Sequence, residues 1–188
     1  MKKSILSFIV LLIFGCKQKN QPNDLLKVVT TTTMITDLVT NIGGQEIKIQ
    51  GLMGSGVDPH LYKASEGDVT KLVNADIIFF NGLHLEGKLV EVFEKMSNKT
   101  PVALAEEIDK STLIGSDYFA SNFDPHVWFN IEYFKQFANK VTRVLSDKNP
   151  ENSASYIENE KSYIAKLNTL ELPSIFELKH SSIFLKLW

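Results

Sequence analysis

Apolar positions along the chain form short continuous runs that are separated by segments with helical spacing. Residues 27–33 and 75–80 are continuous runs rich in β-branched or aromatic side chains, which is typical of strands buried on both faces of a parallel sheet. Residues 46–52 and 101–104 have the shorter apolar patterns of two further strands. The pattern therefore predicts four strands in the first two thirds of the chain.

Helical spacing fills the intervals between these strands. Residues 34–42 and 85–96 repeat apolar positions every three or four residues, and Gly44 ends the first of these helices. Another helix is expected after Ser65, because Asp68 is placed to complete a capping box. Strand–helix alternation predicts an α/β fold, a doubly wound four-stranded parallel sheet flanked by helices. Ligand-binding loops are expected at the carboxyl ends of its strands.

The second half of the chain predicts a long connection followed by helices. Residues 105–123 have little periodicity, and connections of that length are usually functional or mobile. Asn130 then caps a helix with an apolar stripe. Pro150 marks the start of another helix, because proline at the first helical position has no N–H to satisfy. We expect that helix to cover residues 149–172 and to end before an apolar tail at 173–188.

The first residues predict where the protein resides. Residues 1–15 have a basic start and a short apolar run, which is typical of a signal peptide and too short to span a bilayer. The Gly-Cys pair that ends this run resembles a bacterial lipobox, in which the cysteine becomes lipidated. Residues 16–26 are mostly polar and predict a flexible tether. We therefore expect an extracytoplasmic protein that is anchored to a membrane through Cys16.

Composition excludes several classes of function. The 188 residues include 20 Lys or Arg and 22 Asp or Glu, for a net charge of −2. The basic residues form no cluster, which argues against a nucleic-acid partner. Cys16 is the only cysteine, which excludes a disulfide within the chain and a thiolate metal cluster. The length suits one domain with a sizeable core, and we expect a monomer.

One short motif, apolar-Asp-Pro-His-X-aromatic, occurs twice. Its copies are residues 57–62 and 123–128, and they carry His60 and His126. Proline fixes its own φ and favours an extended conformation for the preceding aspartate, so each histidine follows a stiff, non-helical elbow. Imidazole is a common ligand for zinc and similar metals. We therefore expect His60 and His126 to face one metal ion.

The aspartates of the two motifs support this interpretation. Asp58 and Asp124 are placed to accept a hydrogen bond from the neighbouring imidazole and so to fix its tautomer. The alternative is that both histidines are ordinary surface residues, since Asp-Pro is common in turns. Two matching copies on either side of a strand–helix domain favour the metal site.

A segment after the third strand imitates two other functional motifs. Residues 82–88 match the spacing of a P-loop, but the following Leu89 has no hydroxyl for Mg²⁺, and Glu86 would repel phosphate. His84 and Glu86 also match the H-x-E of zinc deaminases, whose paired cysteines are absent here. We expect His84 to be a loop or helix-start residue near the site and not a ligand.

Three segments together resemble the zinc- and manganese-binding solute-binding proteins of bacterial ABC importers. These segments are residues 54–62, 75–86 and 123–129. The resemblance implies a fold of two α/β lobes joined by a long helix, with the metal in the cleft between the lobes. It also implies that His60 and His126 are the two ligands supplied by the first lobe.

The resemblance further implies how the chain is divided. Residues 27–148 correspond to the N-terminal lobe and residues 149–172 to the start of the connecting helix. The second lobe, which supplies the family's third and fourth ligands, has no counterpart, and the tail at 173–188 is atypical. His180 in that tail does not fit the third ligand in spacing or surroundings. We expect a truncated or frameshifted reading frame.

The function implied by the resemblance is capture of Zn²⁺ or Mn²⁺ outside the cytoplasm and its delivery to a membrane permease, impaired by the missing lobe. We expect neither enzymatic activity nor an organic cofactor. Two other classes remain as alternatives. One is a surface adhesion or interaction lipoprotein. The other is a metallohydrolase with an open zinc position, for which Glu66 and Glu86 are the only nearby general-base candidates.

Overall fold

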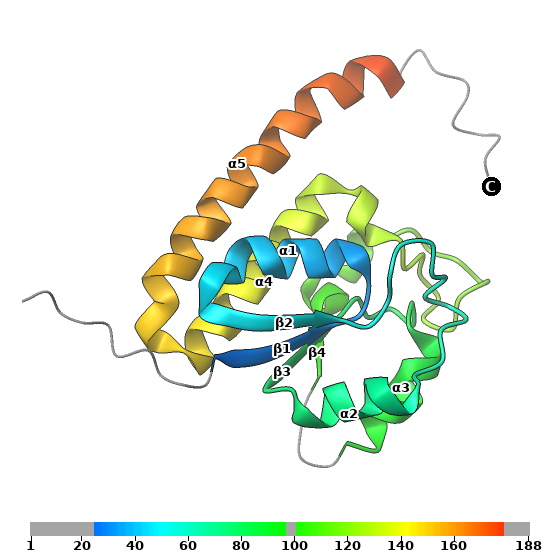
Figure 1. Cartoon of the computed structure of the whole chain (residues 1–188). Helices are drawn as coiled ribbons and strands as arrows, with labels where there is room; N and C mark the ends of the chain where they lie inside the picture. The colour runs from blue at the N-terminus through cyan, green and yellow to red at the C-terminus, as the bar shows by residue number, and fades with distance from the viewer. Residues whose placement is uncertain (1–24, 97–100, 179–188) are drawn as a thin grey trace, which may run out of the picture.

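A parallel sheet lies at the centre of the computed structural model (Figure 1), which describes residues 25–96 and 101–178, with the backbone alone for 171–178. The strands in this part of the chain are β1 (Leu26–Thr30), β2 (Ile47–Gly51), β3 (Ile77–Phe80) and β4 (Val102–Ala103). They pair in the order β2-β1-β3-β4, and every pairing is parallel. The predicted doubly wound four-stranded α/β fold is therefore confirmed.

The strand order places the loops that follow β1 and β3 side by side. Val28 of β1 pairs with Ile49 of β2 on one side and with Ile77 of β3 on the other. The chain therefore turns in opposite directions from the centre of the sheet, as doubly wound sheets do at their ligand-binding crevice. Beyond the last paired residues, the Thr31 N–H donates to the Phe79 carbonyl over 3.2 Å and holds the two carboxyl ends together.

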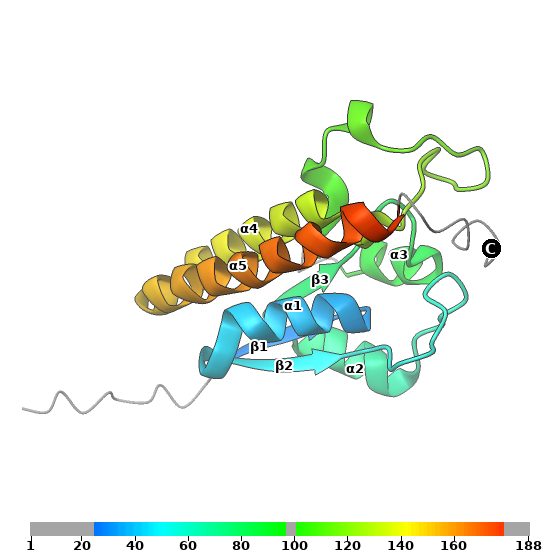
Figure 2. The ribbon, with the colours of Figure 1, turned by 90° about the horizontal axis from the view of Figure 1, so that it is seen from above.

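Helices cover both faces of the sheet (Figures 1 and 2). On one face lie α1 (Thr33–Gly43), α4 (Ile131–Lys148) and α5 (Ser153–Leu178). The other face carries α2 (Glu66–Asn74) and α3 (Gly87–Glu94). Successive strand residues point to opposite faces, so both sides of a central strand must be apolar to be covered in this way.

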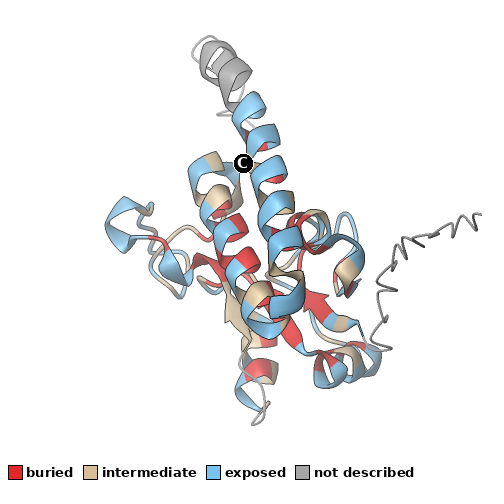
Figure 3. Ribbon diagram, turned by 90° about the vertical axis from the view of Figure 1, so that its left-hand side faces the viewer, coloured by how far each residue is buried: buried red, intermediate tan, exposed pale blue. Residues whose placement is uncertain are grey.

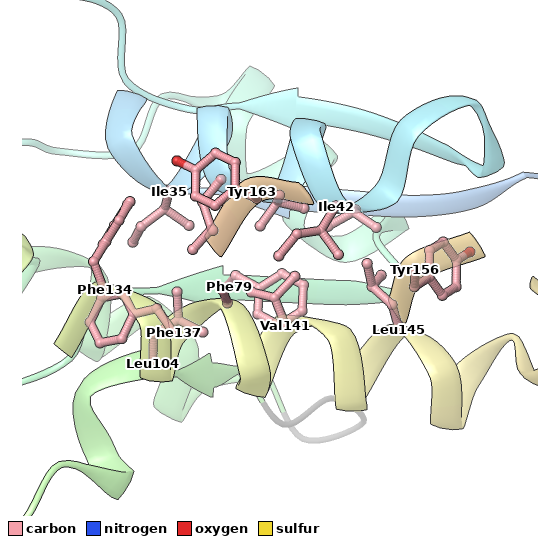
Figure 4. Packing of buried hydrophobic residues seen from close by; sticks show 14 of the residues in the cluster. Ile35, Ile42, Phe79, Leu104, Phe134, Phe137, Val141, Leu145, Tyr156 and Tyr163 are labelled. Carbon is pink, nitrogen blue, oxygen red and sulfur yellow. The ribbon is translucent and has the colours of Figure 1, made fainter. Parts of the chain in front are cut away.

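Two apolar clusters result from this arrangement. The larger cluster fills the space between the sheet, α1, α4 and α5, where aromatic and branched side chains interdigitate (Figure 4). The smaller cluster joins Val29 and Ile78 to side chains of α2 and α3. The fully buried members of the larger cluster include Leu38, Ile42, Phe79, Phe137, Leu145 and Tyr156.

The ends of the early helices follow the predicted capping signals. Gly44 adopts φ 56° after α1, and a short 3₁₀ turn (Gly44–Glu46) leads into β2. Ser65 and Asp68 form the predicted capping box at the start of α2. The Asn130 side chain caps α4 by accepting from the N–H groups of Glu132 and Tyr133.

The helix predicted over residues 85–96 is shorter than expected. Gly82, Leu83 and His84 have φ values of 88°, 51° and 60°, so the chain makes a left-handed turn before α3 begins at Gly87. L-residues avoid this region of φ because the Cβ atom approaches the following carbonyl. The apolar spacing of residues 85–96 therefore reflects burial of Leu85 in the turn as well as the face of the helix.

The connection after β4 consists of short turns. A 3₁₀ turn at Leu104–Glu107 follows the strand, and another lies at Lys110–Thr112. An isolated antiparallel bridge pairs Gly115 with Phe123, which brings the chain back to the second Asp-Pro-His motif. A further 3₁₀ turn, Val127–Phe129, separates that motif from α4.

The last helix continues beyond its predicted end. It begins after a 3₁₀ turn at Pro150–Asn152 and extends to Leu178, so the prediction that it stops at residue 172 is wrong. Proline removes one helical hydrogen bond, but leucine, glutamate and isoleucine around Pro173 favour or tolerate helix. α5 packs along α4 and α1 with Tyr156 and Tyr163 in the core, and its C-terminal turns extend beyond the other helices (Figure 1).

Burial along α5 changes with distance from the sheet (Figure 3). Tyr156, Tyr163 and Leu167 face the core, whereas the side chain of Leu170 is 61% exposed. None of the helices in the described ranges combines the length and the apolar character of a membrane span. The predicted signal peptide at 1–15, Cys16, the tether up to residue 24 and His180 lie outside the described residues.

Candidate metal centre

The two motif histidines converge at the carboxyl edge of the sheet. His60 comes from the loop between β2 and α2, and His126 comes from the segment just before the Val127–Phe129 turn. Their Nε2 atoms lie 3.3 Å apart although 66 positions separate the residues in sequence. The ring centroids are 5.3 Å apart with an interplanar angle of 64°. The structure thus brings together the two residues that the sequence singled out.

The repeated motif folds in the same way in both copies. The Oδ1 atom of Asp58 accepts a hydrogen bond of 2.8 Å from the backbone N–H of His60, and Oδ1 of Asp124 accepts one of 2.9 Å from the backbone N–H of His126. The intervening proline has no N–H and a fixed φ, which leaves the histidine N–H as the nearest donor. Each Asp-Pro-His segment is therefore a local turn that aims its own imidazole.

Asp124 also holds the ring of His126. Its Oδ1 atom lies 2.6 Å from Nδ1, so the ring donates its Nδ1 proton and directs Nε2 toward His60. Burial raises the pKa of Asp124. Hydrogen bonds from the backbone N–H and the ring of His126 lower it, as do the charges of His126 and His60. The lowering effects are larger and hold the pKa of Asp124 below its usual range. Asp58 differs, because its hydrogen bond within the described residues goes to backbone only.

The spacing of the two imidazoles suits coordination of one ion. Zinc binds histidine nitrogen at about 2.0–2.1 Å in tetrahedral geometry, so two ligand nitrogens of one zinc site lie about 3.3–3.4 Å apart. The observed separation of the Nε2 atoms, 3.3 Å, matches this value. The hydrogen bond from His126 Nδ1 to a carboxylate is also the usual support for a metal-binding histidine.

The histidine pair is half of a typical four-ligand site. Across residues 25–96 and 101–170, no group of three or more His, Cys, Asp or Glu side chains is placed to hold an ion. A cleft opens beside His126, and its lining includes Asp124, Phe129, Asn130 and Tyr133. His60 is not part of this lining, so the cleft adjoins the second motif and not the space between the two rings.

Phe119 is a component of the site that sequence reasoning missed. Its ring stacks on His60 with centroids 5.7 Å apart and an interplanar angle of 19°, and it meets His126 edge-on at 5.7 Å. Trp128 also packs edge-on against His126, with ring centroids 5.2 Å apart. Phe119 lies in the irregular segment 105–123, where no periodic pattern or motif marks it. Trp128 was visible as the aromatic of the second motif.

The other candidate residues have different surroundings. His84 is exposed in the left-handed turn, so it is a loop residue as predicted. Glu86 is 1% exposed, and its oxygens accept hydrogen bonds from Thr31 Oγ1, Asn81 N and Gly82 N. Burial raises its pKa, although these hydrogen bonds oppose the shift. A side chain enclosed in this way neither faces a phosphate nor serves as a base for solvent-borne substrate.

Comparison with known proteins agrees with this geometry. The family described as "ZnuA: Zinc-uptake complex component A periplasmic" matches residues 28–175, which include both histidines and most of α5. The chain belongs to the ZnuA family. The predicted resemblance to metal-binding proteins of ABC importers is therefore confirmed.

Individual relatives cover most of this chain but only part of their own length. The manganese-binding lipoprotein MntA of Bacillus subtilis is 42% identical over 156 residues, which are 82% of this chain and 51% of MntA. The zinc-binding protein TroA of Treponema pallidum is 41% identical over 145 residues, or 77% of this chain and 46% of TroA. The chain thus spans about half the length of the curated relatives it matches.

A solved structure supports the same assignment. The periplasmic zinc-binding protein TroA from Treponema pallidum superposes with a TM-score of 0.75 at 39% identity, covering 79% of this chain and 53% of TroA. The relatives are named as metal-binding or ABC transporter substrate-binding proteins, and the adhesion alternative finds no support among them. The ZnuA-family assignment therefore covers the sheet, both motifs and the helix that follows.

Proposed function

We propose that this chain captures one divalent metal ion, Zn²⁺ or Mn²⁺, between His60 and His126 and serves an ABC importer as part of its solute-binding protein. The observation that carries the proposal is the separation of 3.3 Å between the two Nε2 atoms. A tetrahedral zinc ion holds two histidine nitrogens at this spacing, and the two rings come from loops that are distant in sequence. The ion is cargo and not a resident cofactor.

The two candidate ions follow from the chemistry and from the relatives. Imidazole nitrogen suits zinc and other borderline metals. One relative is named as manganese-binding and another as zinc-binding, and their sequences are similarly close to this chain. Two imidazole donors alone favour Zn²⁺, whereas Mn²⁺ prefers oxygen ligands, so a preference for Mn²⁺ would depend on the remaining ligands.

The proposed place of action is the outer face of a membrane. Relatives are named as lipoproteins and as ABC transporter substrate-binding proteins. By this analogy, residues 1–15 direct export, Cys16 carries a lipid, and a permease in the membrane is the partner that accepts the ion. Residues 27–148 act as the metal-binding lobe, and α5 acts as the start of the connection to a second lobe.

The pair of histidines sets the expected strength of binding. Structural zinc sites with four ligands have apparent binding free energies of about 10–16 kcal/mol. If the ligands contribute equally, two ligands supply about half of that energy, which corresponds to dissociation constants of about 1–200 μM. This affinity is measurable by calorimetry.

Isothermal titration of the purified chain with Zn²⁺ and with Mn²⁺ tests the proposal. We expect one ion per chain for the wild type and loss of binding in His60→Ala and His126→Ala. His84→Asn is a matched control, because it removes an exposed histidine outside the pair and asparagine tolerates a positive φ. Equal binding by the wild type and the two pair variants would contradict the ligand assignment.

The same preparation distinguishes the other functional classes. A binding protein shows no zinc-dependent turnover on a panel of ester, peptide and phosphate substrates. A surface interaction module would bind its partner equally well after treatment with a chelator. We expect docking on the permease to weaken when the metal is removed.

A further inference from the structure

We propose that the buried pair Asn81 and Glu86 positions the imidazole of His126 for metal binding. Both residues are enclosed, with 1% of each exposed. They lie at the carboxyl end of β3, in the turn between the strand and α3. The inference rests on the proposed metal-binding function and assigns a role to two residues that do not themselves face the ion.

The Asn81 side chain connects the sheet directly to the second motif. Its Nδ2 atom donates to the carbonyl oxygen of Pro125 over 3.0 Å and to that of Gly82 over 3.0 Å. Pro125 is buried, and the next residue is His126. The amide thereby fixes the backbone from which the imidazole projects, 44 positions away in sequence. A second anchor comes from the Asn81 carbonyl, which accepts from the N–H of Ala105 over 2.9 Å.

Glu86 in turn fixes Asn81. Its Oε1 atom accepts from the backbone N–H of Asn81 over 2.8 Å and from the Thr31 hydroxyl over 2.7 Å. Its Oε2 atom accepts from the N–H of Gly82 over 3.3 Å. Thr31 follows β1 and Asn81 follows β3, so one carboxylate fastens the ends of both central strands. The turn that brings Glu86 back to these donors contains the left-handed residues Leu83 and His84.

Two features favour positioning over a purely structural role. Glu86 occupies the N-cap position of α3, yet its carboxylate makes no capping hydrogen bond there and reaches back to the strand ends. The Oδ1 atom of Asn81 is buried without a hydrogen-bond partner among the described residues. Both amide protons of Asn81 are used on the Gly82 and Pro125 carbonyls while its oxygen stays unpaired, at a cost of about 1–3 kcal/mol.

Two conservative substitutions test the proposal. Asn81→Asp replaces the amide donor by an oxygen that repels the carbonyls of Pro125 and Gly82. Glu86→Gln removes the carboxylate charge and exchanges one oxygen for an NH₂ group, which opposes at least the Gly82 N–H. Loss of a residue that orients a ligand typically lowers metal affinity 10–100-fold. We expect a loss in this range for Zn²⁺ in both variants, measured by titration of folded protein, as judged from circular dichroism.

Leu145→Ala is the matched control for general destabilisation. Leu145 is fully buried near the opposite end of α4, about 20 Å along that helix from its start beside the site. The Leu145→Ala substitution should lower the midpoint of unfolding without changing the affinity for Zn²⁺. A positioning role also predicts that the imidazole NMR signals of His126 move in Asn81→Asp and Glu86→Gln but stay in place in Leu145→Ala.

The possible outcomes separate this inference from the proposed function. If the wild type binds no Zn²⁺, the proposed function fails. If the wild type binds and both variants bind equally well with an unshifted His126 signal, only the positioning role is overturned. If Asn81→Asp does not fold, Glu86→Gln decides the question, because it preserves the size and shape of the side chain.

Discussion

Asp124 holds His126 twice with one oxygen atom. Oδ1 accepts from the backbone N–H at 2.9 Å and lies 2.6 Å from the ring Nδ1, so the backbone turn and the tautomer are set by the same carboxylate. In the first copy of the motif, Asp58 makes only the backbone hydrogen bond with His60. The two copies therefore share the hydrogen bond that forms the backbone turn, but only in the second copy does the aspartate also contact the imidazole ring.

This difference predicts unequal effects of the same substitution. Asp124→Asn keeps an oxygen for the backbone hydrogen bond but weakens the bond to Nδ1, and we expect Zn²⁺ affinity to fall 10–100-fold. Asp58→Asn should cost much less, because no ring hydrogen bond is lost. Calorimetric titration of both variants measures the difference. Equal losses would show that the 2.6 Å contact does not control the tautomer.

Phe119 covers the histidine pair, and its removal should speed metal release. The ring stacks on His60 and meets His126 edge-on. Aromatic contacts of this kind contribute about 0.5–1.5 kcal/mol each, which corresponds to a change of about 2–10-fold in rate or affinity. We expect Phe119→Ala to raise the Zn²⁺ dissociation rate within that range in a stopped-flow chelator assay.

The adjacent Tyr118 offers a matched control for this prediction. Its side chain is 96% exposed, and Tyr118→Ala removes a similar ring from the same loop without touching either histidine. Its dissociation rate should equal that of the wild type. If both substitutions accelerate release equally, the effect belongs to the loop and not to the stacked ring.

Asp68 makes stability depend on acid pH. Burial raises its pKa, but hydrogen bonds donated by Ser65, Lys71 and Tyr62 outweigh burial, and the pKa lies well below its ordinary value. The unfolded chain has a pKa near 3.9, so the ionised carboxylate stabilises the fold above about pH 4. This stabilisation decreases as the pH falls from about 4 toward the lower pKa of the folded state.

Urea unfolding at pH 7 and pH 3 measures this contribution. We expect the wild type to lose more stability between these values than Asp68→Asn, whose side chain does not titrate. Asp147→Asn, on the exposed surface of α4, is the control and should follow the wild type. A pH dependence that is unchanged in Asp68→Asn would mean that other carboxylates account for the acid sensitivity.

A hydrogen bond attaches α5 to the lobe. The Tyr163 hydroxyl donates to Oδ2 of Asp37 on α1 over 3.0 Å, with its ring in the main core. Burial and the neighbouring carboxylate raise the pKa of Tyr163. Tyr163→Phe should lower the free energy of unfolding by about 1–2 kcal/mol, measured by urea titration. Asp37→Ala and the double variant complete a mutant cycle, and strictly additive losses would exclude a direct interaction.

Much of the fold was predictable because local signals and global packing agree. The capping box at Ser65 and Asp68, the Gly44 stop and the Asn130 cap lie where the sequence placed them. The convergence of His60 and His126 was predicted from their matching Asp-Pro-His motifs, although only His60 lies in a loop that directly follows a strand. These features depend on residue type and spacing, which a sequence displays directly.

The errors have tertiary causes. Glu86 was a candidate general base near the histidines, whereas the left-handed turn at Leu83 and His84 returns its side chain to the strand ends, where it is buried. The contact between Phe119 and the histidines depends on how an aperiodic segment folds back through the Gly115–Phe123 bridge. α5 continues through Pro173 although proline removes one helical hydrogen bond, because the residues around it favour or tolerate helix.

The central claim is that the imidazoles of His60 and His126 bind the same ion. NMR of protein with isotope-labelled histidine side chains, titrated with Zn²⁺, tests it most directly. We expect the Nε2 signals of His60 and His126 to shift together and to stop shifting at one equivalent, while the signals of His84 stay in place. Independent titration of the two residues, or a shift of only one, would contradict it.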